Sequence, residues 1–239
     1  MSPRMRLDFV SDVSCPWCAI GLGGLERALE RLRGEIEAEI HFEPFELNPQ
    51  MPPGGQDITE HIAQKYGSTP EQQQKSRAMI RARGAEVGFD FRMEARSRIY
   101  NTFDAHRLLH WADETGRPDG ADGMPGQQRL LKKALLAAYF TEGLSPESHD
   151  VLLGAVAQAG LDTARAREIL AGDAYAADVR ARERFYLDQD IHAVPAIIID
   201  ERHLISGGQP AEVFERVLRK IAARRAQEAA EAGTDGAGR

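Results

Sequence analysis

Two cysteines separated by two residues are the part of this sequence most able to do chemistry. Cys15 and Cys18 are the only cysteines among the 239 residues, and Pro16 and Trp17 lie between them. When such a pair opens a helix, its α-carbons lie about 5–6 Å apart, within the range of an unstrained disulfide. The pair can therefore alternate between two thiols and one disulfide, and the spacing predicts redox chemistry at sulfur.

The place of each cysteine on the expected helix predicts its role. A helix N-terminus stabilises an anion through its unpaired N–H groups and its dipole, so the thiolate of Cys15 is favoured and Cys15 is the predicted nucleophile. Pro16 suits the first helical turn, because its fixed φ favours helix entry. Trp17 has no titratable group and adds no positive charge beside the thiolate. Cys18 lies one turn into the helix, where we expect it to be more buried and to resolve a mixed disulfide on Cys15.

A zinc site is the alternative use of the same two sulfur atoms. His106 and His110 stand at i and i+4 on an expected helix, so both could face one ion together with the cysteines. Structural zinc modules usually keep the two halves of the site close in sequence, whereas these histidines lie far from the cysteines along the chain. The sequence therefore favours a redox pair and no bound metal.

The composition excludes some classes of partner. The chain has 30 Lys and Arg against 37 Asp and Glu, a net charge of -7, so its surface repels nucleic-acid phosphates and anionic lipids. No run approaches the roughly 18 apolar residues of a membrane-spanning helix, and the first residues lack the apolar segment of an export signal. We therefore expect a cytoplasmic protein whose partners include neither nucleic acid nor membrane.

The elements around the cysteines form a strand–helix–strand unit. Leu7 and Phe9 alternate with polar residues, which predicts a strand over residues 6–12. Apolar residues at helical spacing predict a helix over residues 18–33, and a second alternating stretch predicts a strand over residues 40–45. A helix that joins two strands in this way makes them parallel neighbours.

A helical block and a second group of strands follow. The strand signal returns in the β-branched run at residues 196–200 and again at residues 203–206, before a last helix that Pro210 can open. Strands so far apart in the chain bury their apolar faces by joining one sheet, so the helical block is an insertion into an α/β domain. Periodicity and breakers predict its helices over residues 57–66, 70–87, 102–115, 127–141, 146–159 and 173–188.

This order divides the chain into an α/β domain and an inserted all-α domain. We assign residues 1–51 and 190–223 to the α/β domain and residues 52–189 to the insertion. Residues 224–239 are rich in alanine, glycine and charged residues without apolar anchors, so we expect a disordered tail there.

Several short motifs resemble one known family. Residues 11–21, around the cysteines, and residues 44–49 resemble the DsbA-like thioredoxin-fold family, specifically its cytoplasmic FrnE-like branch. The similarity spans roughly residues 6–220, and the combined motifs are more specific than any one of them. The other stretches that agree, in the same order along the chain, are residues 101–108, 138–143, 194–195 and 205–210.

The resemblance implies a thioredoxin-like fold with a large all-α domain inserted between the βαβ and ββα halves. It also implies a cis Val194–Pro195 bond facing the cysteine pair, with Pro195 in the catalytic site and the backbone of Val194 pairing with the substrate. Related kappa-type glutathione transferases and 2-hydroxychromene-2-carboxylate isomerases use glutathione. The residues that the resemblance implies for substrate or glutathione binding are Val194, Asn48, Ser206, Gly207 and Gly208.

These observations predict a thiol–disulfide oxidoreductase that acts on thiols or disulfides of proteins or small molecules. No tightly bound cofactor is expected, glutathione is the candidate co-substrate, and a homodimer is left open. The alternative function is a glutathione-dependent isomerase or transferase for a small aromatic substrate, because the relatives that use glutathione keep the same fold. In a third interpretation, the chain binds a partner or an ion through the loop at residues 119–124 and does no chemistry.

Overall fold

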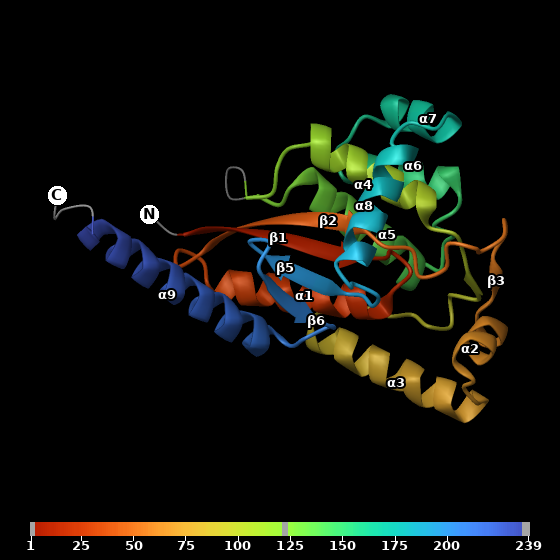
Figure 1. Cartoon of the computed structure of the whole chain (residues 1–239). Helices are drawn as coiled ribbons and strands as arrows, with labels where there is room; N and C mark the ends of the chain where they lie inside the picture. The colour runs from red at the N-terminus through yellow and green to blue at the C-terminus, as the bar shows by residue number, and fades with distance from the viewer. Residues whose placement is uncertain (1–2, 121–123, 236–239) are drawn as a thin grey trace.

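The main sheet has four strands, which are β1 (Arg4–Ser11), β2 (Glu37–Pro44), β5 (Ala196–Ile199) and β6 (His203–Ser206). The computed structural model describes residues 3–120 and 124–235, and Figure 1 shows the sheet at its centre. The strand order is β2-β1-β5-β6; β1 and β2 are parallel, whereas β5 is antiparallel to β1, and β6 to β5. The parallel pair and the joining of the distant strands into one sheet are therefore confirmed.

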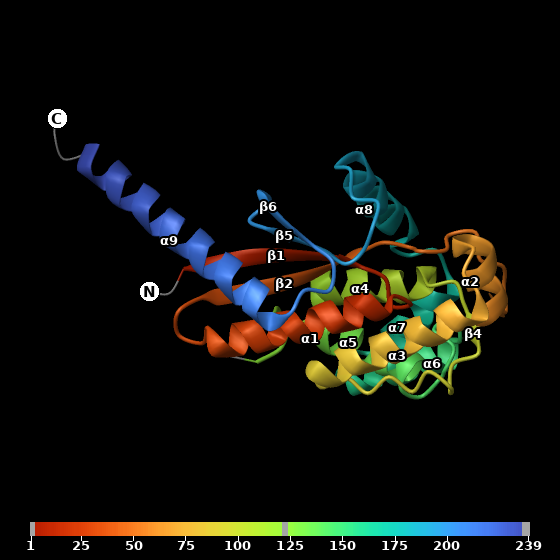
Figure 2. The same ribbon diagram turned by 90° about the horizontal axis from the view of Figure 1, so that it is seen from below.

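The alternation of side chains along β1 explains how both faces of the sheet are covered. Phe9 belongs to the core that includes α1 (Pro16–Arg31). Its neighbour Val10 points to the other face and packs with Tyr186 of α8 (Ala176–Asp188). Figure 2 shows α1 and α8 on opposite sides of the sheet. The cysteine pair thus begins a helix that is held along its length by the sheet.

The insertion between β2 and β5 is mostly helical, as predicted, but it is not all-α. A short two-stranded sheet pairs β3 (Gln56–Asp57) with β4 (Arg98–Ile99). Strands of this length carry no alternation, so the sequence pattern could not reveal them. The helices of the insertion before α8 are α2 (Ile58–Tyr66), α3 (Pro70–Glu86), α4 (Phe103–Thr115), α5 (Gln127–Phe140), α6 (His149–Gln158) and α7 (Thr163–Ala171).

Helix α7 is missing from the sequence-based prediction, although its start carries a capping signal. The carboxylate of Asp162 accepts hydrogen bonds from the N–H groups of Ala164 and Arg165 at 2.8 and 3.2 Å. The helix buries Ile169 in the core of the insertion. Across residues 3–120 and 124–235, no helix is long and apolar enough to cross a membrane.

The last helix, α9 (Ala211–Asp235), corrects the expectation of disorder from residue 224. Its buried Phe214 packs in the core with α1, and the helix continues beyond its last apolar anchor. Arg225 donates to the carbonyl oxygen of Arg4 and pairs with Asp200, at 2.9 Å in each case. Alanine, glutamate and arginine also have high helix propensity. The propensity of these residues and the contacts of Arg225 together stabilise the helix beyond its last apolar anchor. Residues 236–239 of the expected tail lie outside the described residues.

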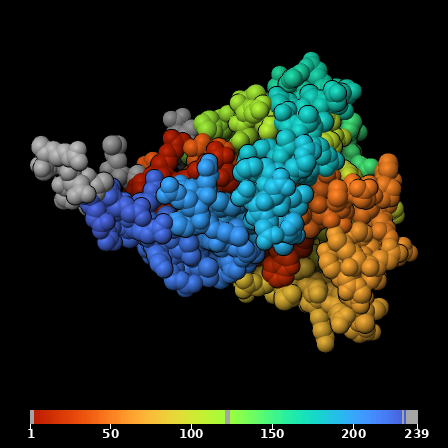
Figure 3. Space-filling view, in the orientation of Figure 1, coloured from red at the N-terminus to blue at the C-terminus, as the bar shows by residue number. Residues whose placement is uncertain are grey.

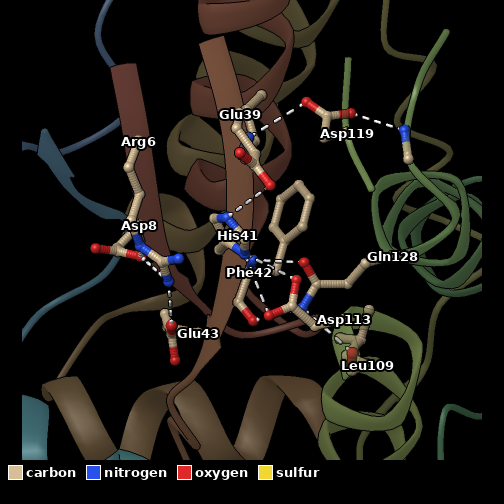
Figure 4. A network of polar contacts seen from close by, with 12 residues as sticks. Arg6, Asp8, Glu39, His41, Phe42, Glu43, Leu109, Asp113, Asp119 and Gln128 are labelled. Carbon is tan, nitrogen blue, oxygen red and sulfur yellow. Dashed lines mark hydrogen bonds and ion pairs between the residues drawn. The ribbon is translucent and has the colours of Figure 1, made fainter. Parts of the chain in front are cut away.

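The outer edge of β2 is closed by side chains of the insertion rather than by another strand. The side-chain amide of Gln128 on α5 accepts from the N–H of Phe42 (2.8 Å) and donates to the carbonyl oxygens of Phe42 and Leu109 (3.0 and 3.2 Å). Asp119 accepts from the N–H of Ile40 (3.3 Å). Figure 4 shows Gln128 and Asp119 directed toward this strand. The insertion therefore takes the place of a neighbouring strand and fixes α5 against the sheet.

Buried carboxylates on the sheet are paired with arginines. Asp8 of β1 and Glu43 of β2 are both buried. The guanidinium of Arg6 lies 2.7 Å from Asp8 and 3.7 Å from Glu43, and Figure 4 shows it beside both carboxylates. Arg182 of α8 donates from Nε to Glu43 at 2.9 Å. The pairing offsets the cost of burying these charges and attaches α8 to the sheet.

Replacing Gln128 with leucine tests the docking of α5. The variant nearly keeps the side-chain volume but leaves the buried N–H and C=O of Phe42 without partners, so we expect the free energy of unfolding to fall by about 3 kcal/mol. Urea unfolding followed by circular dichroism measures the change. Gln74→Leu, on an exposed position of α3, is the control and should change it by less than about 0.5 kcal/mol. Equal stability of the two variants would mean that apolar packing alone holds the insertion.

Candidate active site

The cysteine pair opens α1, where the sequence placed it. Cys15 is the N-cap residue, Pro16 is the first residue of the helix, and the side chain of Cys15 makes no capping hydrogen bond. The N–H of Cys18 donates to the carbonyl oxygen of Cys15 at 3.1 Å, which closes the first turn. Both thiols are free; Cys18 is fully buried, whereas Cys15 borders a cavity. A molecule in that cavity meets Cys15 and not Cys18.

The loop before β5 faces the outer thiol. The Val194–Pro195 bond is cis, as the family resemblance implied. The thiol of Cys15 donates to the carbonyl oxygen of Val194 at a sulfur–oxygen distance of 3.7 Å. Pro195 lies against α1 at Gly21, where an added Cβ would be 3.1 Å from the ring Cγ. A larger residue at position 21 would therefore push this loop from its place beside Cys15.

The glycines predicted to bind glutathione lie behind this loop. The N–H of Gly207 donates to the carbonyl oxygen of Pro195 at 2.8 Å, and a Cβ on Gly208 would lie 2.8 Å from the carbonyl oxygen of Trp17. Ser206 is the exposed last residue of β6. Among the described residues, none of the three lines the cavity at the cysteine. They support the loop in this structure, and their binding of glutathione stays a prediction.

A cavity of about 670 Å³ lies beside Cys15, at the junction of the α/β part and the insertion. Cys15, Pro16, Trp17, Asn48 and Val194 border it from the α/β part, so the structure brings these five predicted site residues together. Helices α2 and α3 contribute the opposite wall. A substrate that reaches Cys15 must lie between the two parts. The apolar residues of the lining include Phe45, Ile58, Ile62, Ile80, Met93 and Ile99.

Asn48 holds a polar cluster on the cavity wall. Its Oδ1 accepts from Nζ of Lys65 (2.8 Å) and lies 2.9 Å from Nε2 of His61. Nζ of Lys65 also donates to the carbonyl oxygen of Leu47 at 2.6 Å. Burial and the charge of Lys65 lower the pKa of His61, so this histidine is neutral at neutral pH. The cluster places a cation of α2 beside the cavity, and a role of Asn48 in substrate binding stays a prediction.

Asp12 is a fully buried carboxylate to which the sequence pattern assigned no role. It accepts hydrogen bonds from the N–H groups of Ser14 (3.0 Å) and Leu47 (2.7 Å), and Nε2 of His106 lies 3.7 Å away. Burial alone raises its pKa, but His106 and the two N–H donors outweigh burial and hold the pKa of Asp12 below its usual range. The carboxylate thereby joins the turn that carries Cys15 to the chain segment after β2.

Cys18 shares its buried environment with a lysine of the insertion. Burial raises the pKa of the Cys18 thiol well above its usual value and Cys15 raises it further, whereas the charge of Lys132 lowers it. Lys132 on α5 is only 1% exposed, and burial lowers its pKa. The signal that could have revealed it is helical spacing, since Lys132 lies three and four residues before Leu135 and Leu136, on the apolar side of the helix.

The two histidines considered for zinc lie in different surroundings. His106 faces Asp12, whereas His110 lies 3.3 Å from Glu114 and packs on the ring of Tyr175. In the described part of the chain, no group of three or more His, Cys, Asp or Glu side chains could hold a metal ion. Residues 121–123 of the loop considered for binding a partner or ion lie outside the described residues.

Comparison with known proteins gives a family for the chain. The family of DSBA-like thioredoxin domains matches residues 6–219. A probable DsbA oxidoreductase from Streptomyces coelicolor, known from its crystal structure, is 32% identical, with a TM-score of 0.78 over 90% of this chain and 89% of its own. The uncharacterized protein YwbO of Bacillus subtilis is 26% identical over 216 residues, which are 90% of this chain and 96% of its own. The cytosolic disulfide reductase DsbM from Pseudomonas aeruginosa, solved with GSH, is 16% identical and shares the fold, with a TM-score of 0.59 over 90% of this chain and 98% of its own.

These matches confirm the predicted thioredoxin-like fold with a helical insertion. They also agree with thiol or disulfide chemistry, because the most similar of these crystal structures is that of a probable DsbA oxidoreductase. The branch of the family, the roles of the individual site residues and the use of glutathione stay predictions.

Labelling with a small thiol reagent should distinguish the two cysteines. Because only Cys15 borders the cavity, we expect N-ethylmaleimide to modify it at least about tenfold faster than Cys18 in the reduced protein at neutral pH. Intact-mass spectrometry over time measures both rates. Cys18→Ser should keep the fast adduct and Cys15→Ser should lose it. Rapid labelling of Cys15→Ser would contradict the burial of Cys18.

Replacing Asp12 with asparagine tests the buried carboxylate. We expect the variant to lose about 3 kcal/mol of unfolding free energy at neutral pH, because the charge-assisted hydrogen bonds from Ser14 and Leu47 are weakened. The pKa of Asp12 is lower in the folded than in the unfolded chain, so its contribution is present above about pH 4 and disappears as the pH falls further. Urea unfolding across pH should show the two proteins converging in acid. The exposed Asp188→Asn is the matched control, and a gap independent of pH would contradict the role of the charge.

Proposed function

The chain belongs to the family of DSBA-like thioredoxin domains, and on that premise we propose that it is a thiol–disulfide oxidoreductase whose redox pair is Cys15 and Cys18. The family membership bears out the resemblance found in the sequence. The unequal access to the two thiols carries the proposal: both are buried, at 3% and 0% exposure, but Cys15 borders a cavity at a helix N-terminus and Cys18 is enclosed one turn later. In such a pair, one thiol reacts with the substrate, and the second thiol then attacks the mixed disulfide that the first has formed.

We propose Cys15 as the nucleophile. Its sulfur lies at the N-terminus of α1, where unpaired N–H groups and the helix dipole favour a thiolate. The first turn of the helix contains no acidic residue in the sequence, so no negative side chain of that turn opposes the anion. The carbonyl oxygen of Val194, 3.7 Å from the sulfur, belongs to the bend directly before β5, and we propose that a substrate backbone aligns beside it.

The proposed reaction consists of two exchanges. The Cys15 thiolate attacks one sulfur of a substrate disulfide, forms a mixed disulfide with it and releases the other sulfur as a thiolate. Cys18 then loses its proton and attacks the sulfur of Cys15, which closes the Cys15–Cys18 disulfide and releases the second substrate thiolate. Two electrons pass from the cysteine pair to the substrate. The same steps in reverse oxidise a dithiol.

The cavity beside Cys15 supports a substrate with both apolar and anionic groups. Its lining includes the cationic side chains of Lys65, Arg77 and Arg96, in a chain whose net charge is -7. Glu46, a carboxylate that also lines the cavity, is paired with Arg180. We therefore propose thiols or disulfides that carry a carboxylate near the sulfur, whether on a small molecule or on a protein segment. Glutathione, a tripeptide thiol with two carboxylates, fits as the co-substrate.

A glutathione-dependent isomerase or transferase is the other function suggested by the sequence. That chemistry would use the fold and the cavity, but Cys18 would have no role in the reaction. The buried second thiol, one turn from the first, favours redox exchange over this alternative.

Cysteine variants should separate the two functions. In an insulin-reduction assay with dithiothreitol, we expect Cys15→Ser to fall to the uncatalysed background, because no thiol remains at the cavity. Cys18→Ser should lose sustained turnover and retain a covalent substrate adduct on Cys15, detected by intact-mass spectrometry under non-reducing conditions. Full activity in Cys15→Ser would refute the proposed function. Turnover that requires glutathione and is indifferent to loss of Cys18 would support the isomerase or transferase.

A further inference from the structure

Lys132 is a buried amine without a hydrogen-bond partner among the described residues. Its side chain is 1% exposed, and its Nζ makes no hydrogen bond to any part of residues 3–120 and 124–235. The ring of Phe42 in β2 lies beside the amine, with Nζ 5.8 Å from the ring centroid. Burying an amine in this way destabilises a fold, and an apolar side chain of similar size would be expected to stabilise it. A structural role in packing therefore does not account for a lysine at this position.

The groups around Lys132 are those of the redox centre. The charges of Cys18, Asp12 and Cys15 act on Lys132 and raise its pKa against the effect of burial. Helix α4 adds His106 behind Asp12, at 3.7 Å from that carboxylate. Helix α6 contributes apolar side chains to the core that it shares with α5. The Phe42 ring beside Nζ belongs to the same core as Cys15 and Cys18, so the amine of the insertion borders the core that holds the cysteine pair.

The docking of α5 holds Lys132 at this place. Gln128 stands one helical turn earlier, at i and i+4, so the two side chains lie on the same face of α5. Gln128 is bonded to the N–H and C=O of Phe42, and the ring of the same residue lies under Nζ of Lys132. Two independent contacts with one residue of β2 therefore orient this face of the helix toward the cysteine pair.

Resolution of a mixed disulfide needs a group that removes the proton of Cys18. Cys18 is fully buried, so solvent base cannot reach it readily. Asp12 is poorly suited, because its oxygens already accept from Ser14 and Leu47 and its pKa is held low. Lys132 is suited, because Nζ has no hydrogen-bond partner in the described structure and burial disfavours its charged form.

We propose that Lys132 accepts the proton of Cys18 during resolution, a step that rests on the proposed function. The neutral amine takes the proton of the Cys18 thiol and becomes an ammonium. The resulting thiolate attacks the sulfur of Cys15, the Cys15–Cys18 bond forms, and the bond from Cys15 to the substrate sulfur breaks. The substrate leaves as a thiolate with the electron pair of that bond. The ammonium returns its proton when the pair is next reduced.

The test follows the two exchanges separately with 5,5′-dithiobis(2-nitrobenzoate), a symmetrical aromatic disulfide that releases a coloured thiolate. The reduced full-length protein should release a first equivalent when Cys15 attacks and a second when Cys18 resolves. Stopped-flow absorbance records both phases. Cys18→Ser, which can release only the first equivalent, identifies which phase is which.

In Lys132→Met, we expect the first phase to stay within about twofold of wild type and the second to slow about 100-fold at neutral pH. The difference should narrow as the pH rises, because a growing fraction of Cys18 is then already a thiolate and needs no base beside it. Lys132→Gln, which is polar but takes up no proton, should behave in the same way. The control is Lys133→Met on the same helix, whose exposed lysine pairs with Glu26 at 2.8 Å and should leave both phases unchanged.

The outcomes separate this inference from the proposed function. Equal second phases in Lys132→Met and Lys133→Met would overturn the inference and leave the oxidoreductase intact. Equal slowing of both phases would also overturn it, because that result indicates disturbed packing. A wild-type protein that releases only one equivalent would refute the proposed function itself. The melting temperature of Lys132→Met should not fall, since the change removes an unpartnered buried amine.

Discussion

The hydrogen bonds between Gln128 and the backbone of Phe42 are the contact on which the rest of the structure depends. β2 is an edge strand, and its N–H and C=O groups would be costly if they were buried without partners. Gln128 provides an acceptor and a donor to one residue, so α5 docks against the strand in a single register. That register determines where each later residue of α5 meets the sheet, and it brings Lys132 to the cysteine pair.

Helix α5 belongs to two cores at once. Leu131 and Leu135 pack in the core of the insertion, whereas Leu136 and Phe140 pack in the core that contains α1. Protein interiors are densely packed and transmit strain, so a shift of the insertion would displace the side chains around the cysteines. The cavity is likewise lined by both parts, because α2 and α3 lie across it from the loops of the α/β part. Figure 3 shows α2 and α3, in orange and gold, on the surface of the molecule. The candidate active site is therefore a property of the junction between the two parts.

The sequence predicts what is local and periodic in this protein. The strands, most helices and the cysteine pair follow from alternation, helical spacing and helix-start signals, and the family follows from the motifs around Cys15. The contact of Gln128 with Phe42 joins positions 86 residues apart, and no periodicity couples a side-chain amide to a distant backbone. The sequence did not predict that Asp12 and Lys132 are buried, because the burial of a charged side chain depends on how whole elements pack against one another. The end of α9 is the opposite case, since helix propensity was available in the sequence and outweighed the lack of apolar anchors.

In both exchanges of the proposed reaction, negative charge develops on sulfur, and a different source of positive potential lies beside each of the two sulfurs. Cys15 lies at a helix N-terminus, where the N–H dipoles are fixed before the reaction begins. Cys18 is one turn deeper and fully buried, so an anion there needs a partner that becomes charged at the same moment. An amine in apolar surroundings suits this need, because burial favours its neutral form and a thiolate beside it favours its charged form. The inserted helical part thus supplies, through Lys132, the proton acceptor that the redox helix lacks.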